Sequence, residues 1–119
     1  MVDDQPDTCR LLVALLRYAG HTPAAADGGA AALAHLRSHP GVALVLLDYM
    51  MPGMNGFDVL RALRSDPQYD GLNVLMYSAV SDPGVREQAL RLGAQGWVVK
   101  GTEWAELQAL VERHAGSAA

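Results

Sequence analysis

The chain has 119 residues, half of them hydrophobic, and thirteen acidic against nine basic side chains leave a formal charge of −4. This length suits one domain with its own core, and no apolar run approaches the ~20 residues that a membrane-spanning helix needs. The absence of any Lys/Arg cluster argues against direct nucleic-acid binding. The acidic start at Asp3 and Asp4 argues against a signal peptide, and the single cysteine, Cys9, excludes an internal disulfide, so we expect a cytoplasmic protein.

Strand-forming and helix-forming segments alternate along the chain. The predicted strands are residues 1–4, 21–26, 42–48, 73–78 and 96–100. The first is very short and the second is poor in β-branched residues, whereas 42–48 is a continuous apolar run, typical of a strand buried on both faces. The helices are predicted to begin at Pro6, at Ala30, at Phe57, at Pro83 and after a Thr102 cap.

Turn and cap residues agree with this division. Asn55 and Asp82 are well placed to cap the helices that follow them, and Gly20 and Gly93 to end helices. Five strand–helix alternations with short connections predict a doubly wound α/β fold with a mainly parallel sheet. We expect one domain over residues 1–115 and a frayed tail over 116–119.

Polar side chains follow four of the predicted strands: the pair Asp3 and Asp4, then Asp48, Ser78 and Lys100, which is the only lysine in the chain. The carboxyl ends of parallel strands meet at one edge of a sheet, so these residues should converge. Each one alone has a plainer explanation. The acids suit helix N-termini, a serine commonly ends a strand, and a lysine is usually solvated. Their combination at one edge is what points to function.

The expected group of carboxylates needs a cation. Ligands made only of oxygen favour Mg²⁺, whereas Zn²⁺ would call for cysteine or histidine. A carboxylate that faces Mg²⁺ and an ammonium can act as a nucleophile toward a phosphoryl group and form an aspartyl phosphate. The lysine and the serine hydroxyl would stabilise the oxygens of the transferring group.

These motifs resemble those of the receiver domains of two-component response regulators, the CheY-like family. The matching segments are Asp3-Asp4, Asp48-Tyr-Met-Met-Pro-Gly-Met-Asn-Gly56, Ser78-Ala79 and Gly93-Ala-Gln-Gly-Trp-Val-Val-Lys100. The resemblance implies a flavodoxin-like, parallel five-stranded sheet with strand order 2-1-3-4-5, in which strand 1 is truncated to a stub. It also implies that Asp48 is the phosphoacceptor.

The same resemblance assigns roles to the other site residues. Asp4 and Asp48 would bind Mg²⁺ directly, together with the backbone carbonyl of Met50, and Asp3 would act through water. Ser78 and Lys100 would hold the phosphoryl group. Trp97 stands at the aromatic position that switches together with Ser78.

The resemblance further implies the partners. A sensor histidine kinase or a phosphotransfer protein would donate the phosphoryl group, and a downstream protein or an output domain would read the switched face. The chain would carry out self-phosphorylation and self-dephosphorylation only, so it would not be an enzyme with an external substrate. Neither nucleic acid nor membrane is expected as a partner. A homodimer through the face of the fourth and fifth helices is a possible assembly, for which the sequence gives no specific support.

Two features depart from the family pattern. Only Met1 and Val2 precede Asp3, where the family has a longer apolar strand, and we therefore expect the natural start to lie upstream or the strand to have been shortened. Gly101 replaces the proline that usually follows the lysine, which predicts a looser loop and a less well oriented Lys100.

These departures keep one alternative open, a receiver-like module that binds proteins without phosphorylation. An Mg²⁺-dependent aspartate phosphatase is disfavoured, because the segment that begins at Asp48 lacks the second acid of an Asp-x-Asp motif. Nucleotide binding is disfavoured as well, because the chain has no Walker-type or Rossmann glycine motif.

Overall fold

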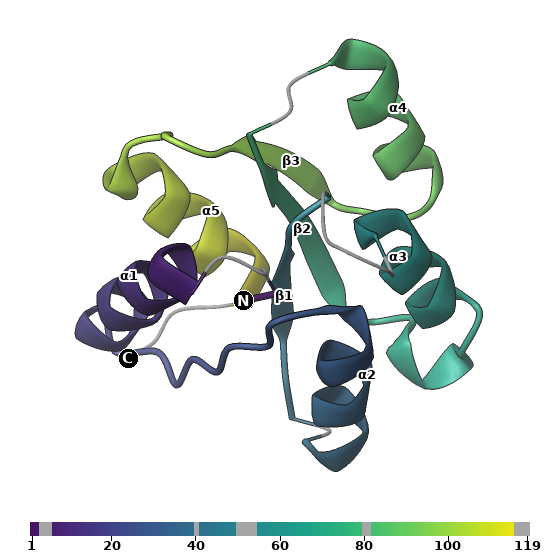
Figure 1. The fold of residues 1–119 in the computed structure, drawn as a ribbon, viewed down its shortest axis with the longest axis horizontal. Coiled ribbons are helices and arrows are strands. Elements are labelled where there is room, and N and C mark those ends of the chain that lie inside the picture. Colours follow the sequence, from purple (N-terminus) through teal and green to yellow (C-terminus); the bar gives the residue numbers. More distant parts are fainter. Residues whose placement is uncertain (3–5, 40, 50–54, 80–81, 116–119) are drawn as a thin grey trace.

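A computed structural model describes residues 1–2, 6–39, 41–49, 55–79 and 82–115. In this part of the chain, parallel strands lie at the centre and helices surround them (Figure 1). The strands are β1 (Leu44–Leu47), β2 (Asn73–Ser78) and β3 (Gly96–Val99), and their order in the sheet is β1-β2-β3. The helices are α1 (Pro6–Tyr18), α2 (Gly29–Ser38), α3 (Gly56–Arg64), α4 (Pro83–Arg91) and α5 (Trp104–Ala115), and a short 3-10 turn, η1, spans Pro67–Tyr69. The predicted α/β fold with a parallel sheet is confirmed.

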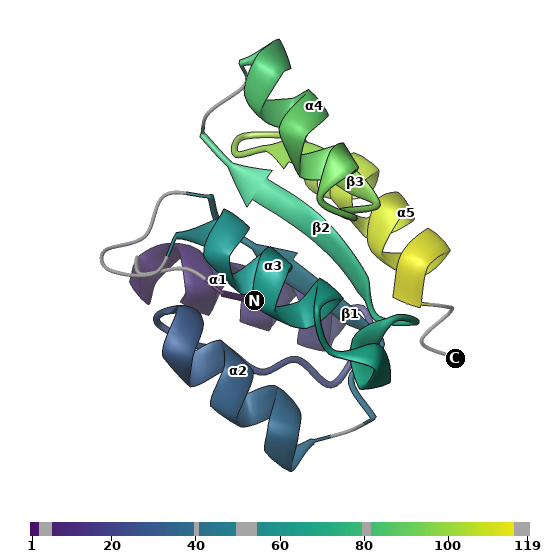
Figure 2. The same cartoon turned by 90° about the vertical axis from the view of Figure 1, so that its right-hand side faces the viewer.

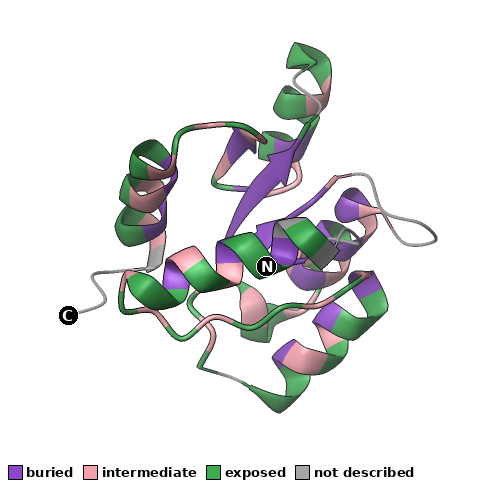
Figure 3. Ribbon diagram, turned by 60° about the vertical axis from the view of Figure 1, so that its left-hand side comes forward, coloured by how far each residue is buried: buried purple, intermediate pink, exposed green. Residues whose placement is uncertain are grey.

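The helices cover both faces of the sheet (Figures 1 and 2). Helices α1 and α5 pack on one face, where the buried side chains are Leu12, Leu16, Leu46, Leu75, Tyr77, Val98, Leu107 and Val111. Helices α2, α3 and α4 pack on the other, and Val45, Leu47, Val74, Met76 and Trp97 point toward them. The central strands are largely buried, whereas the outer faces of the helices are exposed (Figure 3). This two-sided burial explains the unbroken apolar runs in the sequence, since successive residues of a strand face opposite layers.

The edge of the sheet beyond β1 differs from the prediction. Val2 forms single parallel bridges, to Ala26 on one side and to Leu47 on the other. Residues 21–26 contain that one bridge residue and no strand, so the predicted second strand is wrong. This segment, with Pro23 and three alanines, has little strand propensity. The expected stub of strand 1 is present as Val2, and the described residues contain three of the five predicted strands.

Most helix boundaries follow the cap residues in the sequence. The carboxylate of Asp82 accepts hydrogen bonds from the N–H groups of Gly84 (2.8 Å) and Val85 (3.3 Å), as its predicted role at the start of α4 requires. Thr102, in contrast, does not cap α5. Its hydroxyl donates to the carbonyl of Val99 at 2.6 Å, and the helix begins only at Trp104. Thr102 therefore closes the turn after β3.

None of the described helices is long and apolar enough to cross a membrane.

The α-amino group of Met1 lies against the protein and donates to the carbonyl of Ala24 at 3.0 Å. Loss of hydration lowers the pKa of this amine below its ordinary value of 8.0, and the nearby Cys9 partly offsets that effect. Between the two pKa values the unfolded chain binds more protons, so the free energy of unfolding should rise as pH increases toward about 8 and then level off.

Urea unfolding of this polypeptide at a series of pH values measures that slope. Acetylation of Met1 removes the titrating charge and keeps an N–H donor for Ala24. The acetylated chain should be the more stable one at neutral pH and should lack this contribution to the slope. Equal slopes for the two forms would contradict the prediction.

Candidate functional site

The carboxyl edge of the sheet brings Asp48 and Lys100 together, although they lie 52 residues apart in the sequence. Asp48 directly follows β1, is 4% exposed, and donates its backbone N–H to the carbonyl of Val2 at 2.9 Å. Lys100 directly follows β3, and its Nζ lies 3.1 Å from Oδ2 of Asp48. A carboxylate this deeply buried requires a charged or hydrogen-bonding partner, and the ammonium supplies one.

Ser78 lies between these two residues in the order of the sheet. It ends β2, the strand that pairs with both β1 and β3, and it is 1% exposed. Its carbonyl accepts the backbone N–H of Lys100 at 2.8 Å, which ties the lysine to the end of β2. Among the described residues, Asp48 and Ser78 are the two polar or charged residues that are buried. Both stand at this edge, where a purely structural core would place apolar residues.

The other predicted metal ligands cannot be placed in the same way. Asp3, Asp4 and Met50 lie outside the described residues. In the part of the chain that the structure describes, no group of three or more His, Cys, Asp or Glu side chains is arranged to hold a metal ion. The carbonyl of Val2 accepts the backbone N–H of Asp48. The acidic pair Asp3 and Asp4 comes directly after Val2 in the sequence.

An aromatic cluster leads from Asp48 into the core. Trp97, in β3, is 9% exposed, and its ring centroid lies 6.0 Å from that of Tyr49. The Tyr49 ring is also 4.7 Å from the ring of Phe57 in α3. Trp97 was selected from the sequence, but Tyr49 was not, although its position directly after Asp48 was a usable signal. The ring of Tyr49, the residue after Asp48, therefore links Trp97 to the site.

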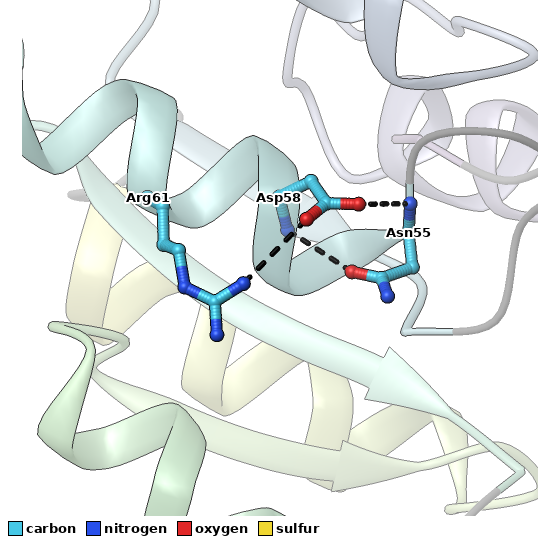
Figure 4. Close-up of polar contacts among 3 residues, drawn as sticks. All are labelled: Asn55, Asp58 and Arg61. Atoms are coloured by element: carbon cyan, nitrogen blue, oxygen red, sulfur yellow. Dashed lines mark hydrogen bonds and ion pairs between the residues drawn. The ribbon is translucent and has the colours of Figure 1, made fainter.

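The start of α3 is fixed against the same site. Asn55 caps the helix as predicted, because its Oδ1 accepts the N–H of Asp58 at 3.0 Å and its own N–H donates to Oδ2 of Asp58 at 3.1 Å (Figure 4). Arg61 lies one turn further along and contacts Asp58 at 3.5 Å. At Gly56 a Cβ atom would overlap the carbonyl oxygen of Asp48, so glycine allows this close approach of helix and strand end.

Gly101 gives a prediction about the loop that carries Lys100. Its φ of +97° lies in the left-handed region, and nothing stands within 4 Å of a Cβ placed there. Gly101→Ala should therefore lower the free energy of unfolding by about 1 kcal/mol through backbone strain alone. Gly101→Pro should cost more, because the ring fixes φ near −65°. In this chain the family's proline is thus incompatible with the loop as it stands.

Urea unfolding measures both variants of Gly101. Gly71→Ala is the matched control, because Gly71 has equally open surroundings and no positive φ. It should be neutral or slightly stabilising. A Gly101→Pro variant as stable as the parent would show that the loop readily adopts another conformation.

The fold is shared with solved receiver domains. Chemotaxis protein CheY4 of Vibrio cholerae superposes with a TM-score of 0.89 at 28% sequence identity, over 95% of this chain and 93% of that one. The BeF3-activated N-terminal receiver domain of Klebsiella pneumoniae RstA gives 0.88 at 27% identity, over 96% and 94% of the two chains. The architecture and the edge site therefore define an α/β domain of the CheY-like class.

The sequence gives the family directly. Residues 1–112 match the family described as "Response regulator receiver domain", and the chain belongs to that family. Chemotaxis protein CheY of Pseudomonas aeruginosa is 40% identical over 101 residues, which are 84% of this chain and 81% of that protein. The DNA-binding response regulator MtrA of Mycolicibacterium smegmatis is 39% identical over 112 residues, 93% of this chain and 47% of that protein.

The chain thus spans about half the length of MtrA. The comparisons confirm the resemblance to receiver domains of two-component systems. Response regulators in general work with histidine kinases and output targets, and receiver domains generally bind Mg²⁺.

Proposed function

We propose that this chain is a phosphoacceptor receiver in which Asp48 accepts a phosphoryl group from a sensor histidine kinase or a phosphotransfer protein. The observation that carries the proposal is the pair of Asp48 and Lys100, in which Nζ lies 3.1 Å from Oδ2 of the buried carboxylate. Buried Ser78 ends the strand between them, at the same edge of the sheet. A carboxylate held in this way supplies the nucleophile, and cationic and hydroxyl groups stand on the neighbouring strands.

In the transfer step an Asp48 carboxylate oxygen attacks phosphorus. The P–O bond forms as the P–N bond of the donor phosphohistidine breaks, and the bonding electrons return to the imidazole nitrogen. Lys100 would offset the negative charge on the phosphoryl oxygens, and the Ser78 hydroxyl would donate a hydrogen bond to one of them. Attack by water on the aspartyl phosphate later releases inorganic phosphate and restores the carboxylate. No external substrate is turned over.

The residues fit Mg²⁺ as the cofactor. The buried carboxylate of Asp48 would supply one oxygen ligand, and its backbone N–H is bonded to Val2, the residue that Asp3 and Asp4 follow in the sequence. Asp4, Asp48 and the Met50 carbonyl would bind the ion directly, with Asp3 acting through water, a set of oxygens that suits this cation. When bound, Mg²⁺ neutralises charge on the transferring phosphoryl group.

Phosphorylation would then be read at a distance from Asp48. Movement of Ser78 toward the phosphoryl group would leave space at the end of β2, and the Trp97 ring would follow. The contact between Tyr49 and Trp97 supports this route, because it joins the residue after the acceptor to the switch residue. The face made by α4, β3 and α5 would bind the downstream partner in one of its two packings.

Intact mass spectrometry after incubation with acetyl phosphate and Mg²⁺ tests the proposal. One added phosphoryl group is expected on the parent chain, and none on Asp48→Asn or in the presence of EDTA. Tryptophan emission in a Trp104→Phe background, which leaves Trp97 as the only tryptophan, should change together with the added mass.

The outcomes separate the proposal from its alternative. Phosphorylation that persists in Asp48→Asn would place the acceptor elsewhere. A parent chain that gains no phosphoryl group at saturating Mg²⁺ and phosphodonor would favour the module that binds partners without phosphorylation.

A further inference from the structure

Two histidine rings stack on each other at the end of helix α2. The ring centroids of His35 and His39 lie 4.0 Å apart, and the angle between the ring planes is 10°. The two residues are four positions apart, a spacing that places side chains on the same face of a helix, one turn after the other. Helix α2 ends at Ser38, and His39 is its C-cap. One turn of backbone therefore holds two imidazoles side by side.

A hydrogen bond selects the ring nitrogen of His39 that is available to a ligand. Nδ1 of His39 lies 3.0 Å from the carbonyl oxygen of His35. A carbonyl oxygen can only accept, so Nδ1 carries the hydrogen in this contact, and Nε2 of the neutral ring keeps its lone pair. Imidazoles that bind metal ions are oriented in this way, with one nitrogen donating to a carbonyl and the other facing the ion. The contact thus orients the ring as a metal ligand requires.

The surroundings of the pair suit a cation. The carboxyl end of a helix carries a partial negative charge, and both rings lie at this end of α2. His39 is exposed and His35 is half-buried, so the rings can turn from the stacked arrangement toward a common ion without disturbing the core. The argument depends only on atoms of α2 itself.

A small cavity next to the pair leaves room for water. It has a volume of about 210 Å³ and lies between the end of α2 and η1, with His39, Leu72 and Tyr69 among its lining residues. The hydroxyl of Tyr69 is buried and has no hydrogen-bond partner among the described residues. Water molecules bound to an ion at His39 would have both space and a polar neighbour there.

The ligand atoms decide which ions fit. Imidazole nitrogen suits Cu²⁺, Ni²⁺ and Zn²⁺, and affinity for nitrogen sites is highest for Cu²⁺, whereas Mg²⁺ prefers oxygen. Two histidines at this spacing on one helix also provide two of the ligands in helical zinc sites. The described residues do not supply a cluster of three or more metal-binding side chains, so water would complete the coordination.

This pair is separate from the acidic site. Helix α2 leads into the amino end of β1, whereas Asp48 follows the carboxyl end of that strand. In Figure 1, α2 reaches the bottom of the molecule, and the chain then turns upward into β1. An ion at the end of α2 would therefore bind independently of the carboxylate of Asp48.

We propose that His35 and His39 form a binding site for one divalent transition-metal ion of the class that prefers imidazole, Cu²⁺, Ni²⁺ or Zn²⁺. Nε2 of His39 and one ring nitrogen of His35 bind the ion, and water fills the remaining positions. The ion links two successive turns of α2 and stabilises the end of the helix. The site adds to the proposed phosphoacceptor function and does not depend on it.

Titration with NiCl2 and with ZnCl2 tests the proposal, in an Asp48→Asn background that removes the carboxylate expected to bind Mg²⁺. Isothermal titration calorimetry should show one ion per chain with a dissociation constant below about 1 mM. The melting temperature should rise by about 5 °C at an ion concentration about tenfold above that constant. The side-chain nitrogen resonances of His35 and His39 should shift on addition of Zn²⁺. MgCl2 should cause none of these changes in this background.

Two variants remove one ligand each with little change to the helix. In His39→Asn the amide nitrogen can replace Nδ1 as donor to the His35 carbonyl, but Nε2 is lost. In His35→Gln a good helix former takes the place of the other ring. Each variant should bind Ni²⁺ and Zn²⁺ about tenfold or more weakly than the parent. The comparison uses the shift caused by the ion within each variant, so a change in basal stability does not obscure it.

His114→Gln is the matched control, because His114 lies in the last turn of α5 and has Leu110, not a histidine, four residues before it. It should bind both ions as the parent does. Three results would overturn the proposal: no saturable binding below about 1 mM, an equal response of the parent and the two ligand variants, or one ion bound per two chains. An equal loss of binding in His114→Gln would overturn it as well.

Discussion

Replacing Lys100 by methionine should lower the free energy of unfolding by about 2 kcal/mol, measured by urea unfolding in the presence of EDTA. The carboxylate of Asp48 has 5% of its side-chain surface exposed, and Lys100 provides the ammonium 3.1 Å away. Removal of one partner from a buried pair costs about 3–5 kcal/mol, because it leaves a charge in a poorly hydrated site. The expected value here is smaller, since Lys100 itself is 18% exposed and water can approach from its side.

Substitution of the other partner of the pair, Asp48, should have a smaller effect on stability. Asp48→Asn keeps the shape of the side chain and removes its charge, and the partly exposed Lys100 can turn its ammonium toward water. A change below about 1 kcal/mol is expected. Equal destabilisation by the two variants would show that the pair is not held in a dehydrated site.

Mg²⁺ adds a further test of the same pair. If the ion binds at Asp48, it should stabilise Lys100→Met by mass action and should stabilise Asp48→Asn much less. The measurement is the shift of the urea midpoint with and without Mg²⁺, so it does not depend on phosphorylation. An equal shift of the midpoint in both variants would show that Mg²⁺ does not bind at Asp48.

The part of the fold that could be predicted from the sequence is the part with strong local signals. The run that ends at Asp48 and the segment Asn73–Ser78 have the continuous apolar character of doubly covered strands, and both are strands. Asn55 and Asp82 cap helices through side-chain chemistry that depends on their immediate neighbours. The convergence of Asp48 and Lys100 followed from the parallel topology, which needs only the order of the elements.

The errors arise where partners distant in the sequence decide the structure. Residues 21–26 contain one bridge residue, Ala26, whose partner is the distant Val2, and pairing is not a local property. Thr102 has the right residue type for a cap, yet the carbonyl of Val99 takes its hydroxyl. Tyr49 was overlooked because its importance comes from ring contacts with Phe57 and Trp97, which only the packed fold brings together.

Arg64 is a further residue that sequence reasoning did not single out. It lies in the last turn of α3, and its guanidinium donates to the carbonyls of Tyr69 (2.8 Å), Leu72 (2.8 Å) and Gly93 (2.9 and 3.1 Å). A further bond of 3.2 Å reaches Oε1 of Gln95, whose same oxygen accepts the N–H of Val74 at 2.6 Å. One side chain therefore joins the end of α3, the turn before β2 and the turn before β3.

Arg64→Met should therefore lower the free energy of unfolding by about 3 kcal/mol and the melting temperature by roughly 10 °C. Methionine preserves the length and the apolar stem of the side chain but leaves the carbonyls without their charged donor. Arg64→Lys should recover only part of the loss, because one ammonium cannot reach carbonyls that the planar guanidinium spans. Thermal and urea unfolding followed by circular dichroism measure both variants.

Arg61→Met is the matched control on the same helix. Arg61 is 53% exposed at its side chain and contacts Asp58 at 3.5 Å, so its loss should change stability by less than about 0.5 kcal/mol. A similar effect of the two methionine variants would mean that Arg64 acts through general helix charge and not through the carbonyls. Gly93 and Gln95 lead into β3, and Lys100 directly follows that strand. Under the proposed function, the Arg64 variant should therefore accept a phosphoryl group more slowly than the parent chain, and the Arg61 variant should accept it at the parent rate.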